Sequence, residues 1–265
     1  MADLFRKGID FSYDPPTGEE CRAAGITAAM VYITDPGAGN KGVTQDRWDD
    51  LGRHGVALGL VWELGNAAVL GGFDQGVADA KNAQANLNAL RGPSNRRPIY
   101  FAIDFDIQPA QYGKAEAYFR GVASVLGVNR TGAYGHDAIL DYLIGRKVIA
   151  FRWQTYAWSK GVRDASNDVL QYDNGQRLGS GTVDLCLMRS SGNWGQKGVP
   201  LAKRPVKPAK APAKADPHVI STVREGDTLS SIAARHNTSL LQVEKLNPQI
   251  KDFDRIVPGE KVRVK

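Results

Sequence analysis

Two aspartates, Asp104 and Asp106, close an apolar run at residues 99–103 that is typical of a buried strand in a parallel sheet. Side chains two residues apart on a strand point the same way, with Cα atoms about 6.6 Å apart. Neighbouring carboxyl groups raise each other's pKa, and glycosidic cleavage needs one protonated and one ionised carboxyl. The pair therefore indicates a sugar-cleaving site. The alternative is a turn that carries two solvated carboxylates.

The elements that must position these aspartates alternate between strand-like and mostly helical segments along residues 1–195. This alternation predicts an α/β fold, a (β/α)8 TIM barrel, whose active site would lie at the C-terminal ends of the strands. The predicted strands cover residues 8–12, 28–33, 57–63, 99–106, 131–135, 148–154, 168–172 and 182–188. No G-x-G-x-x-G motif follows a strand, which argues against a nucleotide-binding doubly wound sheet.

The ends of the predicted strands are rich in acids and amides. They hold Asp10, Glu63, Asp104, Asp106, Tyr134, Gln154, Gln171 and Asp184. The aromatic residues beside them are Tyr13, Trp62, Trp153, Tyr156, Trp158 and Tyr172. Acids and aromatic rings together at a barrel mouth indicate a sugar site, because ring faces pack against the C–H surfaces of sugars. Packing at the rim is the alternative for any single aromatic residue.

Composition argues against several other classes of protein. The two cysteines and four histidines show no metal-ligand spacing, so we expect no metal and no cofactor. Residues 1–196 carry 20 Lys+Arg and 21 Asp+Glu, a net charge of −1, whereas residues 197–265 carry 14 and 7, a net charge of +7. The basic tail favours a polyanionic partner, but its single aromatic residue, Phe253, argues against nucleic acid. No apolar run approaches the roughly 20 residues that span a membrane, so we expect no membrane insertion. We also expect a monomer.

The pattern changes after the predicted barrel. Residues 196–217 are rich in Pro, Ala and Lys and lack apolar periodicity, which indicates a semi-extended linker. Residues 218–265 predict a small βααβ module, with strands near residues 219–223 and 261–265 and two short helices between them. We therefore expect two domains joined by a linker.

The C-terminal module resembles a LysM domain. The resemblance is carried by VREGDTLSSIA at residues 223–233, LNP at 246–248 and IVPGEKV at 256–262. It implies binding of glycans that contain N-acetylglucosamine, such as peptidoglycan, through two loops. The residues of these loops are Gly226, Asp227, Thr228, Leu229, Asn247, Pro248, Gln249 and Ile250. Gly226, Asp227 and Thr228 could also serve only to build the turn and the helix cap.

The barrel resembles the glycoside-hydrolase-like domain of actinobacterial proteins and phage lysins and, more distantly, is similar to family 25 muramidases. The matching pieces are GIDFS at residues 8–12, AIDFD at 102–106, GAYG at 132–135, WQ at 153–154, QY at 171–172 and VDL at 183–185. One departure concerns the fourth strand, where the muramidase pattern has Asp-x-Glu and this chain has Asp-x-Asp. An aspartate is shorter by about 1.5 Å, and a catalytic group displaced by about 1 Å can lose roughly 100-fold in rate.

The resemblance implies a role for each candidate residue in cleaving peptidoglycan strands of N-acetylglucosamine and N-acetylmuramic acid. Asp106 would be the general acid, with Glu63 as the alternative. Asp104 or Asp184 would stabilise the oxocarbenium-like state or position the N-acetyl group of the substrate, and Asp10 would orient the site. The residues expected to hold substrate are Tyr134, Gln154, Trp153, Gln171 and Trp62.

The start of the chain predicts where the protein acts. No apolar stretch follows the basic pair at Arg6 and Lys7, so we expect no signal peptide. A phage endolysin, held in the host cytoplasm until a holin pore releases it to the cell wall, fits this reading. Two alternatives stay open: a non-catalytic protein that binds wall glycan, suggested by the Asp-x-Asp departure, and a hydrolase of another wall polysaccharide such as arabinogalactan.

Overall fold

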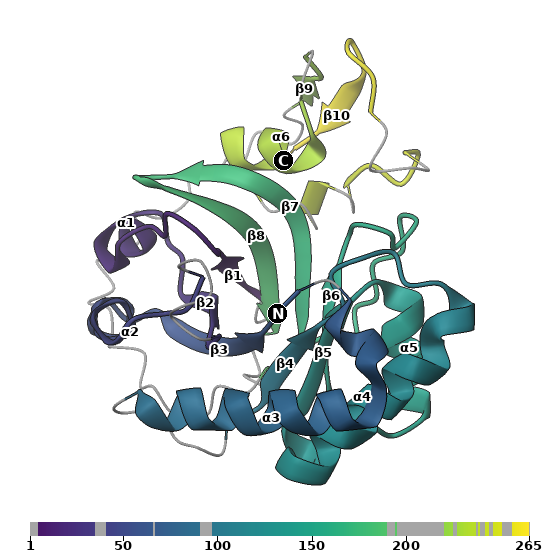
Figure 1. The fold of residues 1–265 in the computed structure, drawn as a ribbon. Coiled ribbons are helices and arrows are strands. Elements are labelled where there is room, and N and C mark those ends of the chain that lie inside the picture. The colour runs from purple at the N-terminus through teal and green to yellow at the C-terminus, as the bar shows by residue number, and fades with distance from the viewer. Residues whose placement is uncertain are drawn as a thin grey trace. The chain divides into compact units, whose positions relative to one another are not determined.

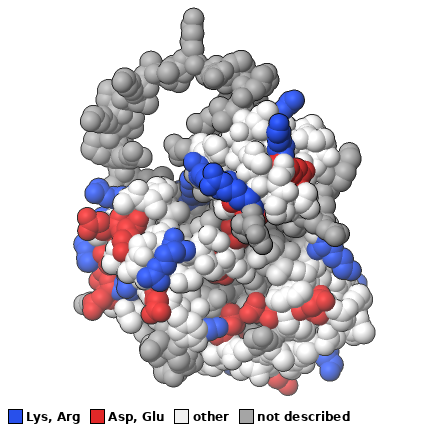
Figure 2. All heavy atoms as spheres, turned by 90° about the horizontal axis from the view of Figure 1, so that it is seen from above, with Lys and Arg blue, Asp and Glu red and all other residues white. Residues whose placement is uncertain are grey.

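The computed structural model describes residues 5–34, 41–65, 67–90, 97–189, 194, 220–224, 227–236, 238, 242–243, 246–250 and 256–264. The chain divides into two compact units, Met1–Lys203 and Arg204–Lys265. Within the described residues, no helix is long and apolar enough to cross a membrane. On the face shown in Figure 2, acidic and basic side chains lie interspersed between broad areas of uncharged side chains.

Eight strands close into a barrel in chain order, which confirms the predicted α/β barrel (Figure 1). The strands are β1 (Phe5–Asp10), β2 (Ala28–Tyr32), β3 (Ala57–Trp62), β4 (Ile99–Ala102), β5 (Thr131–Gly135), β6 (Phe151–Thr155), β7 (Val169–Leu178) and β8 (Gly181–Arg189). Neighbouring strands from β1 to β7 pair in parallel. Their C-terminal ends therefore meet at one mouth, where loops can build a site.

Helices cover the outside of the barrel. They are α1 (Gly18–Ala23), α2 (Gln45–Arg53), α3 (Gly72–Ala89), α4 (Tyr112–Leu126) and α5 (Asp137–Gly145), with short 3-10 turns at Ala68–Gly71, Pro109–Gln111 and Val128–Arg130. The capping box that the sequence predicts at α1 is present: Thr17 Oγ1 accepts from the Glu20 N–H at 3.2 Å, and Glu20 Oε2 accepts from the Thr17 N–H at 2.8 Å. This reciprocal bonding satisfies backbone donors that would otherwise be free at the start of the helix.

Each strand sends alternate side chains into two different cores. Val61, Tyr100 and Trp153 point into the barrel, where they form a core with Met30 and Cys186. Their chain neighbours point outward, among them Trp62 and Phe101, and pack under the helices. This period of two decides which residues at the strand ends can reach the mouth.

The last strand differs from the expectation of a fully parallel (β/α)8 barrel. Only Gly179 and Ser180 separate β7 from β8, and a parallel crossover needs a dozen residues or more. Gly179 adopts a φ of +57°, and β8 returns antiparallel to β7 and pairs antiparallel with β1. The hairpin extends past the shorter strands beside it (Figure 1). The N-terminal part of β8 therefore lies at the mouth, where Asp184 pairs with Asp10.

The second unit contains β9 (Ile220–Thr222), α6 (Leu229–Arg235) and β10 (Lys261–Arg263). β9 and β10 form an antiparallel pair, and the side chains of Ile232, Val243 and Val262 are buried. These elements agree with the predicted small C-terminal LysM fold. The predicted second helix, at residues 238–246, lies largely outside the described residues.

Candidate active site

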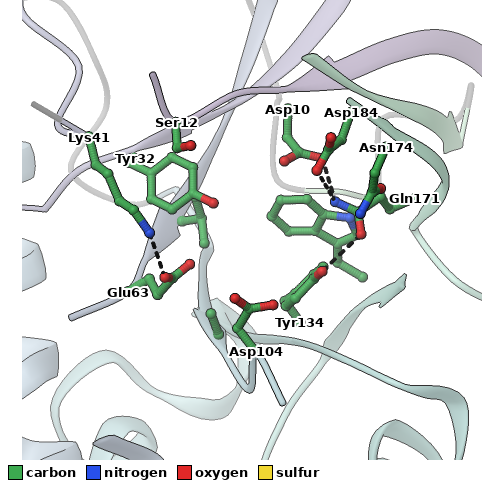
Figure 3. A pocket seen from close by; sticks show the side chains of 13 residues that line it. Asp10, Ser12, Tyr32, Lys41, Glu63, Asp104, Tyr134, Gln171, Asn174 and Asp184 are labelled. Carbon is green, nitrogen blue, oxygen red and sulfur yellow. Dashed lines mark hydrogen bonds and ion pairs between the residues drawn. The ribbon is translucent and has the colours of Figure 1, made fainter. Parts of the chain in front are cut away.

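A cavity of about 220 Å³ opens at the mouth of the barrel (Figure 3). It is lined by Asp10, Ser12, Tyr32, Lys41, Val61, Glu63, Ala102, Asp104, Tyr134, Trp153, Gln171, Asn174 and Asp184. The structure thus brings together four of the five acids that the sequence singles out. Each of the four has a different set of neighbours, which is what a division of chemical roles requires.

Gln171 joins two of the acids. Its Nε2 donates to Asp10 Oδ2 at 3.0 Å and to Asp184 Oδ2 at 3.1 Å. The same side chain accepts through Oε1 from the hydroxyls of Tyr134 and Thr155, each at 2.8 Å. Gln171 is only 2% exposed, so its amide is fully engaged and cannot turn. The sequence predicted a substrate-binding role for Gln171. The structure places Gln171 in the lining of the cavity, where it links two carboxyl groups.

Asp10 is the most enclosed acid, with 4% of its surface exposed. Burial, reinforced by the negative charge of Asp184, raises its pKa from the ordinary 3.8 to about 8, against hydrogen bonds from Gln171 and Cys186 that lower it. The Cys186 thiol donates to Asp10 Oδ2 at 3.2 Å, and burial raises the pKa of that thiol well above its usual range. Asp10 therefore keeps its proton at neutral pH.

Asp184 is half-buried and faces the same cavity. Besides Gln171, the Gly175 N–H donates to its Oδ1 at 2.8 Å. Gly175 lies in β7 where the pairing with β8 is irregular, and this irregularity turns its N–H toward Asp184. Burial raises the pKa of Asp184, while the Gly175 N–H lowers it.

Glu63 forms an ion pair with Lys41, with 2.8 Å between Lys41 Nζ and Glu63 Oε1. Lys41 also lies over the ring of Tyr32, 5.4 Å from its centroid. The bond from Glu63 raises the pKa of Lys41 although burial lowers it. The pair therefore places the ammonium group of Lys41 directly against the Glu63 carboxyl group.

Asp104 faces the cavity from the loop that follows β4 (Figure 3). Within the described residues, no hydrogen-bond donor holds its carboxyl group, in contrast to the other three acids. Burial is the main cause that raises the pKa of Asp104, followed by the charge of Glu63, while Lys41 lowers it. A carboxyl group with a raised pKa that no described donor engages is suited to pass a proton to a substrate.

Asp106, the predicted general acid, does not line this cavity and its side chain is exposed. The alternation that would have turned it inward ends with β4 at Ala102, and the chain then turns, with the Ile107 N–H donating to the Phe105 carbonyl at 2.8 Å. Two residues of separation therefore no longer place Asp104 and Asp106 on one face.

Two predicted substrate-binding residues also point away from the cavity. Trp62 is buried under the helices because Val61 and Glu63, its neighbours in the alternation, occupy the inner face. Gln154 is fully buried, and its amide bonds the Val162 carbonyl and the Asn167 side chain, which fixes the link between β6 and β7. By contrast, Tyr134 and Trp153 do line the cavity.

The cavity contains residues that were not predicted as site residues. Tyr32 shares the inner face of β2 with Met30, so the period of two could have identified it. Lys41, Ser12 and Asn174 come from loops or from the irregular part of β7, where no periodic signal reports the direction of a side chain.

The predicted glycan-binding residues of the second unit divide by exposure. Leu229, Asn247 and Ile250 are buried, and Asn247 bonds the backbone of Arg263 in both directions, at 2.8 and 2.9 Å. Asp227 is held by an ion pair with Arg235 at 2.8 Å.

Among the predicted glycan-binding residues that the structure describes, Thr228, Pro248 and Gln249 have exposed side chains. Thr228 also caps α6, since its Oγ1 accepts from the Ser231 N–H at 3.0 Å. Gly226 lies outside the described residues.

Comparison with known families matches both units. The profile of the Rv2525c-like, glycoside hydrolase-like domain matches residues 19–188, and that of the LysM domain matches residues 222–265. The chain is 26% identical over 200 residues to Rv2525c of Mycobacterium tuberculosis, named as a candidate peptidoglycan hydrolase, and the match spans 70% of this chain and 82% of that protein.

Solved structures agree with this assignment of the fold. The crystal structure of Rv2525c, described as a Tat-secreted protein in complex with L-tartrate, superposes with a TM-score of 0.65 over 70% of this chain and 96% of its own. A bacterial lysozyme from Streptomyces coelicolor superposes with a TM-score of 0.51 at 15% identity, over 71% of this chain and 95% of its own. At this identity, the similarity to the Streptomyces lysozyme concerns the fold alone.

The localisation predicted from the sequence is wrong. The absence of a recognisable signal led to the expectation of a protein held in the host cytoplasm until a holin pore releases it. Rv2525c is Tat-secreted, which points to export across the membrane instead. The sequence argument relied on the first residues of the chain alone, and these do not decide the compartment.

Proposed function

Because the chain belongs to the Rv2525c-like, glycoside hydrolase-like domain family, we propose that it hydrolyses the glycan strands of peptidoglycan while its LysM domain holds it on the wall. The observation that carries this proposal is the cavity with four carboxyl groups in different environments. Glycosidic cleavage needs an acid that keeps its proton beside a carboxylate that does not.

In the proposed reaction Asp104 is the general acid. It delivers its proton to the glycosidic oxygen as the bond from that oxygen to the sugar carbon breaks. Water then supplies the new hydroxyl group of the sugar, and its other proton returns to the Asp104 carboxylate. Its raised pKa supports this role, as does the lack of a hydrogen-bond donor to its carboxyl group among the described residues. Glu63 does not compete for it, because Lys41 Nζ already engages Glu63 Oε1 at 2.8 Å.

Asp184 supplies the negative charge that the positively charged transition state needs. Two N–H donors, from Gln171 and Gly175, fix its carboxyl in place. Because the enclosed Asp10 is protonated, it adds no second negative charge next to Asp184. Tyr134 and Trp153 line the inner end of the cavity, where the Tyr134 hydroxyl also donates to Gln171 Oε1 at 2.8 Å.

The LysM domain raises the concentration of the barrel at an insoluble substrate. Linking two modules makes the second encounter intramolecular, which strengthens overall binding without new contacts. The net charge of +7 in residues 197–265 adds attraction to anionic wall polymers. A lytic role like that of a bacteriophage endolysin is the more specific form of this proposal, and lysis of intact cells by added protein tests it.

A second function, binding of wall glycan without cleavage, is favoured by the exposed position of Asp106, which takes the place of the glutamate of the muramidase pattern. Mass spectrometry of fragments released from purified peptidoglycan separates the two functions. The hydrolase releases fragments with new reducing ends. A chain that sediments with the wall but releases no such fragment would be the binding protein.

A further inference from the structure

Exposure separates the six aromatic residues at the ends of the predicted strands. Trp62 and Trp153 are buried, whereas Tyr13 is 52% exposed and Trp158 is 38% exposed. Isolated exposed aromatic residues are common on protein surfaces, so exposure alone assigns no role. The position and backbone of Trp158 distinguish it from an ordinary surface residue.

Trp158 lies three residues after Thr155, whose hydroxyl donates to the Gln171 amide that holds Asp10 and Asp184. Three residues span at most about 11 Å, so the backbone of Trp158 lies close to the acid cavity. Tyr13 likewise lies three residues after Asp10. Since β6 pairs with β7 and β1 pairs with β8, the two aromatic residues follow strands on either side of the hairpin that carries Gln171 and Asp184.

The backbone at Trp158 is left-handed, with a φ of +59°. L-residues with large side chains rarely adopt this conformation, which persists only where surrounding structure enforces it. Lys160 and Gly161 in the same loop have φ values of +52° and +78°. A strained backbone at an aromatic residue beside the acid cavity indicates that the position of its ring has a function.

Hydrogen bonds on both sides of Trp158 enforce this conformation. The Ala157 N–H donates to Thr155 Oγ1 at 3.2 Å, and Ser159 Oγ donates to the Thr155 carbonyl at 2.6 Å. The Asp137 N–H at the start of α5 donates to Ser159 Oγ at 3.1 Å, and Ser159 is buried. The loop is therefore tied to β6 and α5, while the indole of Trp158 stays exposed. Because the loop is already ordered, packing of a ligand on the indole costs little conformational entropy of the loop.

We propose that Trp158 is a stacking platform for a sugar unit that neighbours the one over the acid cavity, and that it makes the barrel favour long glycan strands over short fragments. The inference rests on the proposed function for the class of ligand. An indole face packs against the C–H face of a pyranose ring, and binding a unit beyond the reacting one raises the yield of productive complexes. Tyr13 is placed to contact the strand on the other side of the hairpin.

The test compares Trp158→Gly with Lys160→Gly in the full chain. Both substitutions place glycine at a left-handed position of one loop, so both relieve the same kind of strain. We expect neither to lower the melting temperature. Trp158→Gly should lower kcat/KM on long peptidoglycan strands by about threefold to tenfold, the size of one aromatic contact, and leave kcat/KM on a disaccharide unit unchanged. Lys160→Gly should change neither, and Trp158→Phe should restore part of the loss.

Equal losses on long and short substrates would overturn the proposal, because they would show that Trp158 acts on the acids and not on a distant sugar. Unchanged kcat/KM on both would also overturn it. Calorimetric binding of soluble glycan oligomers in an Asp104→Asn background distinguishes failure of this inference from failure of the proposed hydrolysis. There, Trp158→Gly should weaken binding of long oligomers by the same factor, and the LysM contribution cancels because every variant carries that domain.

Discussion

Replacing Asp10 by asparagine should stabilise the barrel at neutral pH. The folded protein holds a proton on Asp10 up to about pH 8, whereas an aspartate in the unfolded chain releases it near pH 3.8. Between these values the folded state binds more protons, so the free energy of unfolding falls as the pH rises. The slope from this group reaches ~1.4 kcal/mol per pH unit, or roughly 4 kcal/mol between pH 4 and pH 7.

An asparagine side chain at this position would stay neutral at every pH, while its oxygen could still accept the bond from Gln171. Asp10→Asn should therefore match the wild type near pH 4 and exceed its free energy of unfolding at pH 7 by up to roughly 4 kcal/mol. Urea unfolding followed by tryptophan fluorescence measures this directly, because all five tryptophans of the chain lie in the barrel unit. A variant that is less stable than the wild type at pH 7, with the same slope, would refute the argument that Asp10 is protonated.

Three further predictions concern other contacts. Gln171→Leu should lower kcat at least tenfold and shift the pH profile of activity, because both carboxyl groups lose their common donor; a lower rate with an unchanged profile would argue against this link. Lys41→Met should destabilise the fold by about 1–3 kcal/mol in urea unfolding, since it leaves the enclosed Glu63 carboxylate unpaired, and equal stability would contradict that pairing. Gly121→Ala should lower the melting temperature, because its Cβ would lie 2.1 Å from the backbone oxygen of Phe73 where α3 and α4 meet, costing about 1–3 kcal/mol; an unchanged melting temperature would show that the helices can separate freely.

The architecture of the barrel could be predicted from the sequence because its signals are periodic. Each strand is a short apolar run, and eight of them alternate with mostly helical segments. The direction of β8 could not be derived from the same count, since an apolar run looks alike in parallel and antiparallel strands. The available signal was the short stretch between the last two predicted strands, residues 173–181, because a parallel crossover needs a dozen residues or more.

Individual site residues were harder to predict, because the residue at which a strand ends depends on its pairing with neighbouring strands in the folded protein. Val61 and Glu63 face inward and Trp62 faces outward, which the period of two could have shown. The exposure of Asp106 depends on the strand ending at Ala102, and no residue in the run marks that end.

The bonds of Gln171 illustrate a further limit. They join residues up to 161 positions apart, so only the closed barrel reveals that its amide holds two acids.

The release of reducing ends from purified peptidoglycan by the full chain, compared with its Asp104→Asn and Asp106→Asn variants, tests the central claim most directly. We predict release by the wild type and by Asp106→Asn, and a loss of at least about 100-fold for Asp104→Asn, the usual contribution of a general acid. All three should sediment equally with the wall. Loss in Asp106→Asn together with full activity in Asp104→Asn would contradict the account, as would the absence of reducing ends from the wild type.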